Sequence, residues 1–293
     1  MTVPSAEPSI GGPAAMSYAE LLARLDLAAA GPASFRGDSG AGTGSLFGGL
    51  VAAQASVAAG RTVGAERRLH ALHGLFLLPG RHGPELRFEV ETTRDGRSFS
   101  TRRVRALQDG ALIFDLSASF KRPEVGIEHQ LPGPAAPPPE ECERVEPRRA
   151  AILGIPERER MPMDLRHCEP IPVAPDPERA PRQRLWMRFL GEPPADPLLR
   201  SALLVYASDR MLLSTASVPH GIWWRRGRGA SLDHSFWAHG EVSPEALSDW
   251  LLYACESPVA REAMGLCLGA FYTPQGRRIA SAAQQGLLRL RQA

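Results

Sequence analysis

The chain of 293 residues carries the same order of sequence patterns twice, once on each side of a proline-rich stretch. Each copy starts with a segment of helical spacing, at residues 45–60 and 196–213. Shorter segments typical of antiparallel strands follow, separated by turn dipeptides such as Asp109-Gly110 and Gln275-Gly276. Self-similarity on this scale indicates a duplicated fold unit.

The segment at residues 45–60 is rich in glycine, alanine and serine, and it is apolar on nearly every side. A helix of this kind has no face suited to water, so we expect it to be buried. A sheet of about five strands that wraps around the helix would bury it. The predicted fold class is therefore α+β, with a long helix held against a sheet in each half.

Proline divides the chain into segments. It is concentrated at residues 132–141 and 170–181, and because proline lacks a backbone N–H and fixes φ, we expect a covering linker there rather than a sheet. A short apolar stretch at residues 150–155 would anchor it. We predict four segments: a flexible leader at 1–17, an N-terminal unit at 18–125, a proline-rich linker at 126–182, and a C-terminal unit at 183–293.

Composition excludes several classes of protein. The formal net charge is +2, so nothing calls for nucleic acid or an anionic membrane as a partner. No apolar run reaches the roughly 20 residues that a membrane-spanning helix needs, and the N-terminus does not have the pattern of a signal peptide. The four cysteines have neither CxxC nor zinc-finger spacing, which fits free thiols in a reducing compartment. We therefore expect a cytoplasmic protein.

Asp209 is the most informative single residue. With helical spacing it shares a stripe with apolar residues such as Val205, Tyr206 and Leu212. A carboxylate on an apolar face is costly unless it is paired or hydrogen-bonded, and its pKa is displaced. We expect a catalytic or binding role; the alternative is a buried aspartate that bonds the local backbone.

The last strand supplies a second polar group on an apolar face. Alternation places Gln284 with Ala280, Ala282 and Leu288 on the side that would face a helix. Its amide could hold a water or a carbonyl group, or it could be a core glutamine bonded to backbone. In the segment before it, alternation places Ser231 on one face and His234 on the other; Ser231 by itself could be a plain strand-start hydroxyl.

Other motifs are weak or absent. There is no G-x-S-x-G elbow and no P-loop lysine, and the histidines are not spaced as metal ligands along one strand face. We therefore expect no metal and no cofactor. The arginines of the run at residues 223–229, which include Arg225 and Arg226, could meet phosphate groups or could be a solvated loop.

Several longer stretches together resemble the acyl-CoA thioesterase II family. In the first half they are FGG-x4-Q, LHALHGLFLLPG, and the block from FEVETTRDG to GIEHQ. In the second half they are VYASD, PHG, SLDHSFWAH and GAFYTPQGRRIASAAQQG. The resemblance covers nearly the whole chain. It implies a double hotdog, in which two sheets each wrap a long central helix, and hydrolysis of fatty acyl-CoA to a fatty acid and coenzyme A.

The resemblance also implies a catalytic trio, Asp209, Ser231 and Gln284. In the predicted mechanism Asp209 is the general base, and the other two orient a water. We further expect substrate contacts from matching positions, which are Gly48, Gly49, Gln54, His73 and His234. Because the first half has Gln54 where the second has Asp209, we expect one working site per chain.

This sequence departs from the family in places. Ser231 stands where threonine is common, and Leu50 stands where a second glutamine is frequent. Gly240 directly follows the WAH segment, where the family often has an arginine. Two other functions stay open: a hotdog enoyl-CoA hydratase and a non-catalytic acyl-CoA-binding protein. Free sheet edges could pair between chains, so we expect a homo-oligomer.

Overall fold

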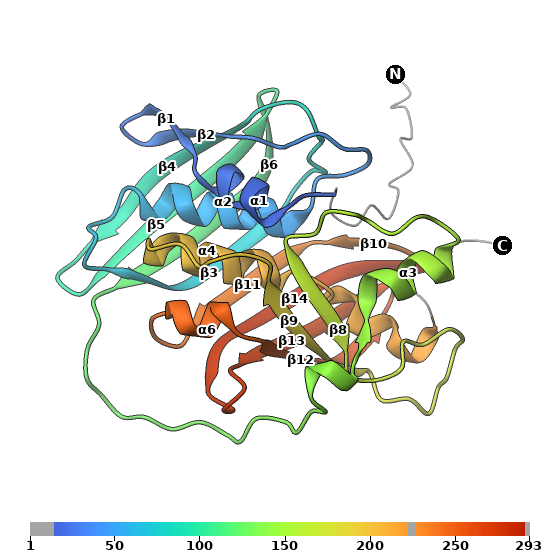
Figure 1. The fold of residues 1–293 in the computed structure, drawn as a ribbon. Helices are drawn as coiled ribbons and strands as arrows, with labels where there is room; N and C mark the ends of the chain where they lie inside the picture. The colour runs from blue at the N-terminus through green and yellow to red at the C-terminus, as the bar shows by residue number, and fades with distance from the viewer. Residues whose placement is uncertain (1–14, 222–226, 291–293) are drawn as a thin grey trace.

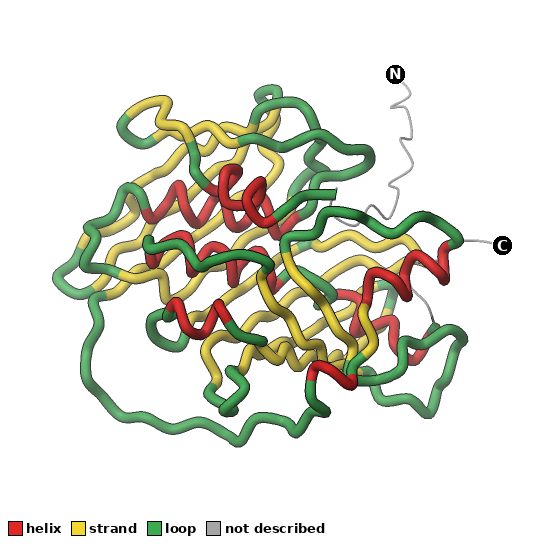
Figure 2. Tube along the Cα trace, in the orientation of Figure 1, coloured by secondary structure: helices red, strands yellow, loops and turns green. Residues whose placement is uncertain are grey.

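The computed structural model describes residues 15–221 and 227–290. The described strands form one fourteen-stranded sheet in which every pairing is antiparallel, and helices α2 and α4 lie side by side against it (Figure 1). This arrangement is α+β, as predicted. Figure 2 shows that helix occupies the middle of the molecule and that strands lie behind it and below it.

The first half contributes two helices and six strands. They are α1 (Tyr18–Leu25), β1 (Ala28–Gly31), β2 (Ser34–Gly37), α2 (Gly48–Gly60), β3 (Arg68–Phe76), β4 (Leu86–Asp95), β5 (Phe99–Gln108) and β6 (Ala111–Lys121). The β5–β6 hairpin turns at Asp109 and Gly110, both with positive φ, which is the backbone that a tight Asp-Gly turn requires.

The rest of the chain adds further elements. They are η1 (Pro139–Glu141), β7 (Glu143–Arg144), α3 (Val145–Leu153), β8 (Met163–His167), β9 (Arg182–Phe189), α4 (Pro197–Ser208), η2 (Leu213–His220), β10 (Gly227–Ser231), β11 (Asp233–Ala238), α6 (Pro244–Ser248), β12 (Leu251–Arg261), β13 (Met264–Tyr272) and β14 (Arg278–Leu290).

Strand order repeats between the two halves. From the centre outward, one half runs β3-β6-β5-β4-β2 and the other β11-β14-β13-β12-β9. The halves meet where β3 pairs with β11, with His73 opposite Ser235. Each half has its long helix before the strand at this junction, α2 before β3 and α4 before β11. The strand order of one half is thus the same as that of the other.

Helix α2 is buried on all sides. Every residue from Gly49 to Ala59 is buried, because the helix lies between the sheet and α4. The prediction that this helix is buried is confirmed, and its small side chains allow the close contact with α4.

Helix α4 is shorter than predicted. Its N-terminus is capped by the Asp196 side chain, which accepts a hydrogen bond from the Leu198 N–H at 2.8 Å. The helix ends at Ser208, and Asp209 is the C-cap residue. Met211 has a φ of 66°, which no right-handed helix tolerates, so the chain turns there instead of continuing to Leu213.

Part of the proline-rich region is regular structure, and the prediction of a linker without sheet is wrong there. Strand β8 pairs with β9, and β7 pairs with β8 at the sheet edge. The prolines flank β8 at Pro162 and Pro170 and leave the N–H groups between them free to pair. Helix α3 includes residues 150–153 of the predicted anchor, and its Ile152 is buried against Ile171.

Residues 1–14 of the predicted leader lie outside the described residues, whereas Met16 belongs to the core and is only 2% exposed. No described helix combines the length and the apolar character that a bilayer crossing needs.

Candidate active site

Asp209 and Gln284 form a direct hydrogen bond inside the protein. The Nε2 amide of Gln284, from β14, donates to Asp209 Oδ1 at 2.5 Å. Asp209 is 9% exposed and Gln284 is 1% exposed. The end of α4 places the carboxylate, and the inward face of β14 places the amide. The sequence patterns thus identified two polar groups that the fold brings into contact.

Ser231 reaches the same amide through an irregularity in the sheet. Ser231 of β10 lies opposite Gly286 of β14, and Ser235 of β11 lies opposite Ala283. One extra residue, Leu232, therefore lies between the two strands relative to β14, which is a β-bulge. The bulge changes the alternation, so Ser231 Oγ accepts from Gln284 Nε2 at 3.0 Å.

The same bulge places His234 on the face of Ser231, so the prediction of opposite faces is wrong. His234 is fully buried, and its Nδ1 atom lies 3.3 Å from Gln284 Nε2. Its Nε2 atom lies 2.7 Å from Ser208 Oγ, which itself donates to the Val205 carbonyl. Ser208 must therefore accept from His234 Nε2–H, which leaves Nδ1 unprotonated toward Gln284. Burial lowers the pKa of His234 to about 4, in keeping with a neutral ring.

Asp209 has a strongly displaced pKa. Burial raises the pKa of the carboxyl group from 3.8 to about 6, while hydrogen bonds from the Gln284 amide and the Gly49 backbone, together with the charge of Arg210, act to lower it. The carboxylate is therefore mostly ionised at neutral pH and still basic enough to accept a proton.

The N-terminus of α2 abuts Asp209. Phe47 is the N-cap residue and its side chain makes no cap hydrogen bond, and the backbone N–H of Gly49 in the first turn hydrogen-bonds Asp209. A Cβ atom at Gly48 would lie 3.1 Å from Asp209 Oδ2, and one at Gly49 would lie 2.8 Å from the Tyr206 carbonyl. Glycine lets the helix end approach this closely.

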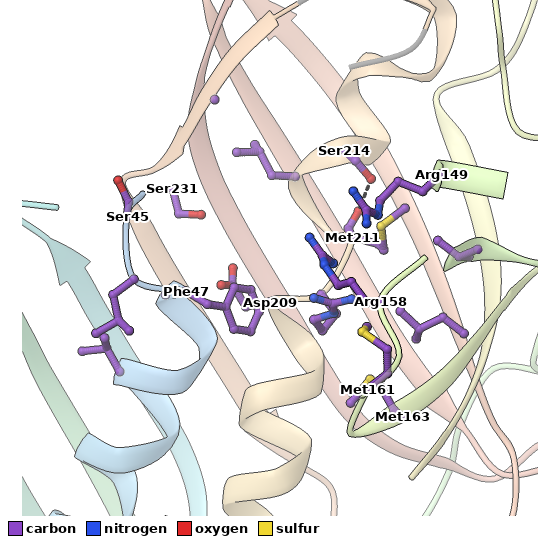
Figure 3. A pocket seen from close by; sticks show the side chains of 18 of the residues that line it. Ser45, Phe47, Arg149, Arg158, Met161, Met163, Asp209, Met211, Ser214 and Ser231 are labelled. Atoms are coloured by element: carbon purple, nitrogen blue, oxygen red, sulfur yellow. Dashed lines mark hydrogen bonds between the residues drawn. The ribbon is translucent and has the colours of Figure 1, made fainter. Parts of the chain in front are cut away.

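A cavity of about 850 Å³ opens on this site. One part of its wall is apolar and consists of Leu46, Val51, Phe76, Ile113 and Phe114. Another part carries arginines and methionines from the region between the halves and from the end of α4. Figure 3 shows Ser45 and Phe47 on one side of the cavity and Arg149 and Arg158 on the other, with Asp209 between them.

Three of the predicted substrate contacts do not line this cavity. Gln54 is buried lower on α2, where its Nε2 donates to the carbonyls of Arg24 and Asp38. His73 is exposed on the outer face of β3, where its Nδ1 lies 3.0 Å from Ser235 Oγ. His234 contacts the Gln284 amide and does not line the cavity. Gly48 does line the cavity, and Gly49 contacts Asp209.

Sequence reasoning missed the groups that support the site. Ser208 orients His234, and the Tyr253 hydroxyl donates to the Ser208 carbonyl at 2.7 Å. Neither residue stands out in the sequence, since each is a single polar side chain within an apolar segment. Arg225 and Arg226 lie outside the described residues. Among residues 15–221 and 227–290, no group of three or more histidine, cysteine or acidic side chains is arranged to hold a metal ion.

Comparison with known proteins places the chain in a family. Residues 36–121 match a family described as acyl-CoA thioesterase N-terminal domain, and residues 175–287 match one described as acyl-CoA thioesterase. Human acyl-coenzyme A thioesterase 8 is 33% identical over 84% of this chain and 81% of its own length. The chain belongs to the acyl-CoA thioesterase family. This is a family of thioester hydrolases, and a further member, acyl-CoA thioesterase 2 of Haemophilus influenzae, is 36% identical over 87% of this chain and 92% of that protein.

Solved structures agree with this family assignment. An acyl-CoA thioesterase II from Mycobacterium marinum is 36% identical, with a TM-score of 0.76 over 93% of this chain and 98% of that one. A conserved protein with a hotdog fold from Alicyclobacillus acidocaldarius is 19% identical, with a TM-score of 0.73 over 92% of this chain and 97% of that one. The latter likeness concerns the fold alone, which is of the hotdog type.

Proposed function

We propose that this family member hydrolyses fatty acyl-CoA to a free fatty acid and coenzyme A, using a water activated by Asp209, Ser231 and Gln284. The observation that carries the proposal is the convergence of Asp209 and Ser231 on the side-chain amide of Gln284. Gln284 Nε2 lies 2.5 Å from Asp209 Oδ1 and 3.0 Å from Ser231 Oγ, and Asp209 and Ser231 both line the cavity.

Each residue has a separate task. Asp209 and Ser231 hold the water from two sides, since both have oxygens at the cavity wall. Asp209 takes one proton from the water as its oxygen forms a bond to the thioester carbonyl carbon. Gln284 holds the carboxylate in place through its hydrogen bond to Asp209. The neutral His234 ring, which does not line the cavity, contacts the Gln284 amide and keeps it in position. The C–S bond then breaks, and the proton passes from Asp209 to the departing sulfur, which yields the thiol and regenerates the base.

The oxyanion formed in this step needs hydrogen-bond donors. The N-terminus of α2 supplies backbone N–H groups and the positive end of a helix dipole beside Asp209, and the Gly48 N–H is the candidate donor. Loss of one such donor in a comparable site costs on the order of 3 kcal/mol. A covalent acyl-enzyme is not part of the proposal, because Ser231 Oγ contacts an amide rather than a base.

A thiol-release assay with acyl-CoA esters of increasing chain length tests the function. We expect stoichiometric release of free thiol and fatty acid. Saturable binding without thiol release would instead indicate an acyl-CoA-binding protein. Hydration of crotonyl-CoA without thiol release would indicate a hydratase.

We also propose that residues 18–125 and 183–293 are two hotdog units joined by residues 126–182, supported by the repeated strand order on the two sides of the β3–β11 pair. A homo-oligomer and a cytoplasmic location stay predictions. Light scattering coupled to size-exclusion chromatography measures the first, and fractionation of the cells that make the protein measures the second.

A further inference from the structure

Three arginines gather on one wall of the cavity. Arg149 comes from α3, Arg158 follows that helix, and Arg210 directly follows Asp209. Figure 3 shows Arg149 beside Ser214 and Met211, and Arg158 below it, close to Met161. The proposed hydrolysis of a plain fatty acyl chain uses none of these charges.

Only part of this positive charge has a partner. Glu146 accepts two hydrogen bonds from Arg149, at 2.6 and 2.9 Å, and lies 3.7 Å from Arg158 Nη1. Arg210 makes no ion pair with any described residue, and its Nε has no hydrogen-bond partner in the part of the chain that the structure describes. Its guanidinium carbon lies 5.6 Å from the centre of the Phe47 ring.

An unpaired buried guanidinium is costly. Arg210 is only 8% exposed, and burial lowers its pKa. Burial, followed by the charge of Arg149, lowers the pKa of Arg158 to about 10. Arginine stays ionised at neutral pH even so. The charges of Glu146 and Asp209 act on Arg210 from outside ion-pair distance, so its charge is only partly compensated. A bound anion would supply the missing partner and would be held strongly, because water is largely excluded.

We propose that Arg149, Arg158 and Arg210 form an anion-binding subsite. It binds a carboxylate at the far end of the acyl chain of the thioester substrate. This inference rests on the proposed function and specifies its substrate class. Arginine also binds phosphate, which coenzyme A carries. The carboxylate is favoured because Arg210 is adjacent to Asp209 in the chain, whereas the whole pantetheine arm separates the reacting sulfur from the nearest phosphate.

Binding of non-hydrolysable thioether analogues, measured by titration calorimetry, tests the subsite without any turnover. The two ligands are coenzyme A alkylated with a hexyl chain and with a chain of equal length that ends in a carboxylate. The proteins are the wild type, Arg210→Met, and Arg160→Met. Arg160 lines the same cavity, but its side chain is 58% exposed and pairs with Glu20, so it is a matched control. Methionine at 210 removes a buried charge that makes no ion pair with any described residue, and it is not expected to impair folding.

We expect Arg210→Met to weaken binding of the carboxylate-ended ligand by about 10-fold to 100-fold, as loss of a charged hydrogen-bond partner does. Binding of the hexyl ligand should change by less than about 3-fold, and Arg160→Met should leave both unchanged. Equal affinities of wild type and Arg210→Met for all ligands would overturn the subsite.

Pantetheine thioethers with the same two chains separate the two sources of the anion, because they lack the nucleotide phosphates. Under the proposal, the carboxylate effect persists with them. A loss seen for both coenzyme A ligands and for neither pantetheine ligand would assign the arginines to phosphate and overturn the acyl-chain assignment. Thiol release by the wild type, measured in parallel, tests the thioesterase itself. Failure of that assay is distinct from failure of the subsite.

Discussion

The Gln284 amide lies 2.5 Å from the Asp209 carboxylate, although the two residues are 75 positions apart in the chain. Burial and hydrogen bonding act on this carboxylate in opposite directions. Burial raises its pKa more than the bonds from Gln284 and Gly49 and the charge of Arg210 lower it, and the result is a pKa of about 6. A carboxylate in this state is ionised near pH 7 and remains a competent base.

The rate of thioester hydrolysis should rise with pH. We expect kcat to increase through an apparent pKa of about 6, because protonated Asp209 cannot accept a proton from water. Replacing Gln284 with methionine removes a donor that favours the ionised form, so the apparent pKa should move upward and the plateau should fall. Stopped-time assays across the pH range measure both quantities. An unchanged apparent pKa in Gln284→Met would contradict this account of the base.

Stability should depend on pH through the same group. The pKa of Asp209 in the folded protein, about 6, exceeds the ordinary aspartate pKa of 3.8. Between these two pH values the folded protein therefore holds a proton that the unfolded chain releases. The free energy of unfolding therefore declines by roughly 3 kcal/mol as pH rises from about 4 to above 6. Asp209→Asn lacks this loss. Its stability relative to wild type, from urea denaturation, should increase over that window, and a difference that does not vary with pH would speak against a buried ionised carboxylate.

Ser231 should be needed for its hydroxyl alone. Ser231→Ala removes one of two groups proposed to hold the water, and we expect kcat to fall by about 10-fold to 100-fold. Ser231→Thr keeps the hydroxyl and should stay within a few-fold of wild type. Ser235→Ala is a matched control, since Ser235 faces His73 on the other side of the sheet. Steady-state kinetics that ranked the alanine and threonine variants as equals would remove Ser231 from the mechanism.

Gly48 should tolerate no side chain. A Cβ there would lie 2.8 Å from the Phe76 ring and 3.1 Å from Asp209 Oδ2, so either group must shift. We expect Gly48→Ala to lower kcat about 10-fold or more, because small displacements of catalytic groups have large effects on rate. Gly126→Ala, where nothing lies within 4 Å, is the control for a glycine change without contact. Wild-type kcat in Gly48→Ala would refute the close approach of α2.

Periodicity predicted the parts of the site that lie on regular elements. Gln284 was placed on the inward face of its strand by simple alternation, and it is 1% exposed. Small residues predicted the buried helix α2. These inferences succeed because each depends only on the repeat of one element against a nearby core.

Predictions from periodicity were wrong where the backbone is irregular. Alternation separated Ser231 from His234, but the extra residue Leu232 reverses the pattern, and a bulge has no dependable sequence signal. Helical spacing predicted a second helix that continues past Asp209 to Leu213. The helix ends at Ser208 instead, and the positive φ at Met211 prevents it from continuing. The arginine wall could not be predicted, since Arg149 and Arg158 meet Arg210 only through the path of the region between the halves.

The central claim is that Asp209 is the base that activates water. Asp209→Asn keeps the size of the side chain and should lower kcat by about 100-fold to 10,000-fold, which is the usual contribution of a general base. Asp196→Asn is the matched control at the other end of α4, because asparagine caps a helix as well as aspartate does. Thiol release from a fatty acyl-CoA, measured at saturating substrate for both variants, decides the matter. The account predicts near-wild-type kcat for Asp196→Asn and severe loss for Asp209→Asn; full turnover by folded Asp209→Asn would contradict it.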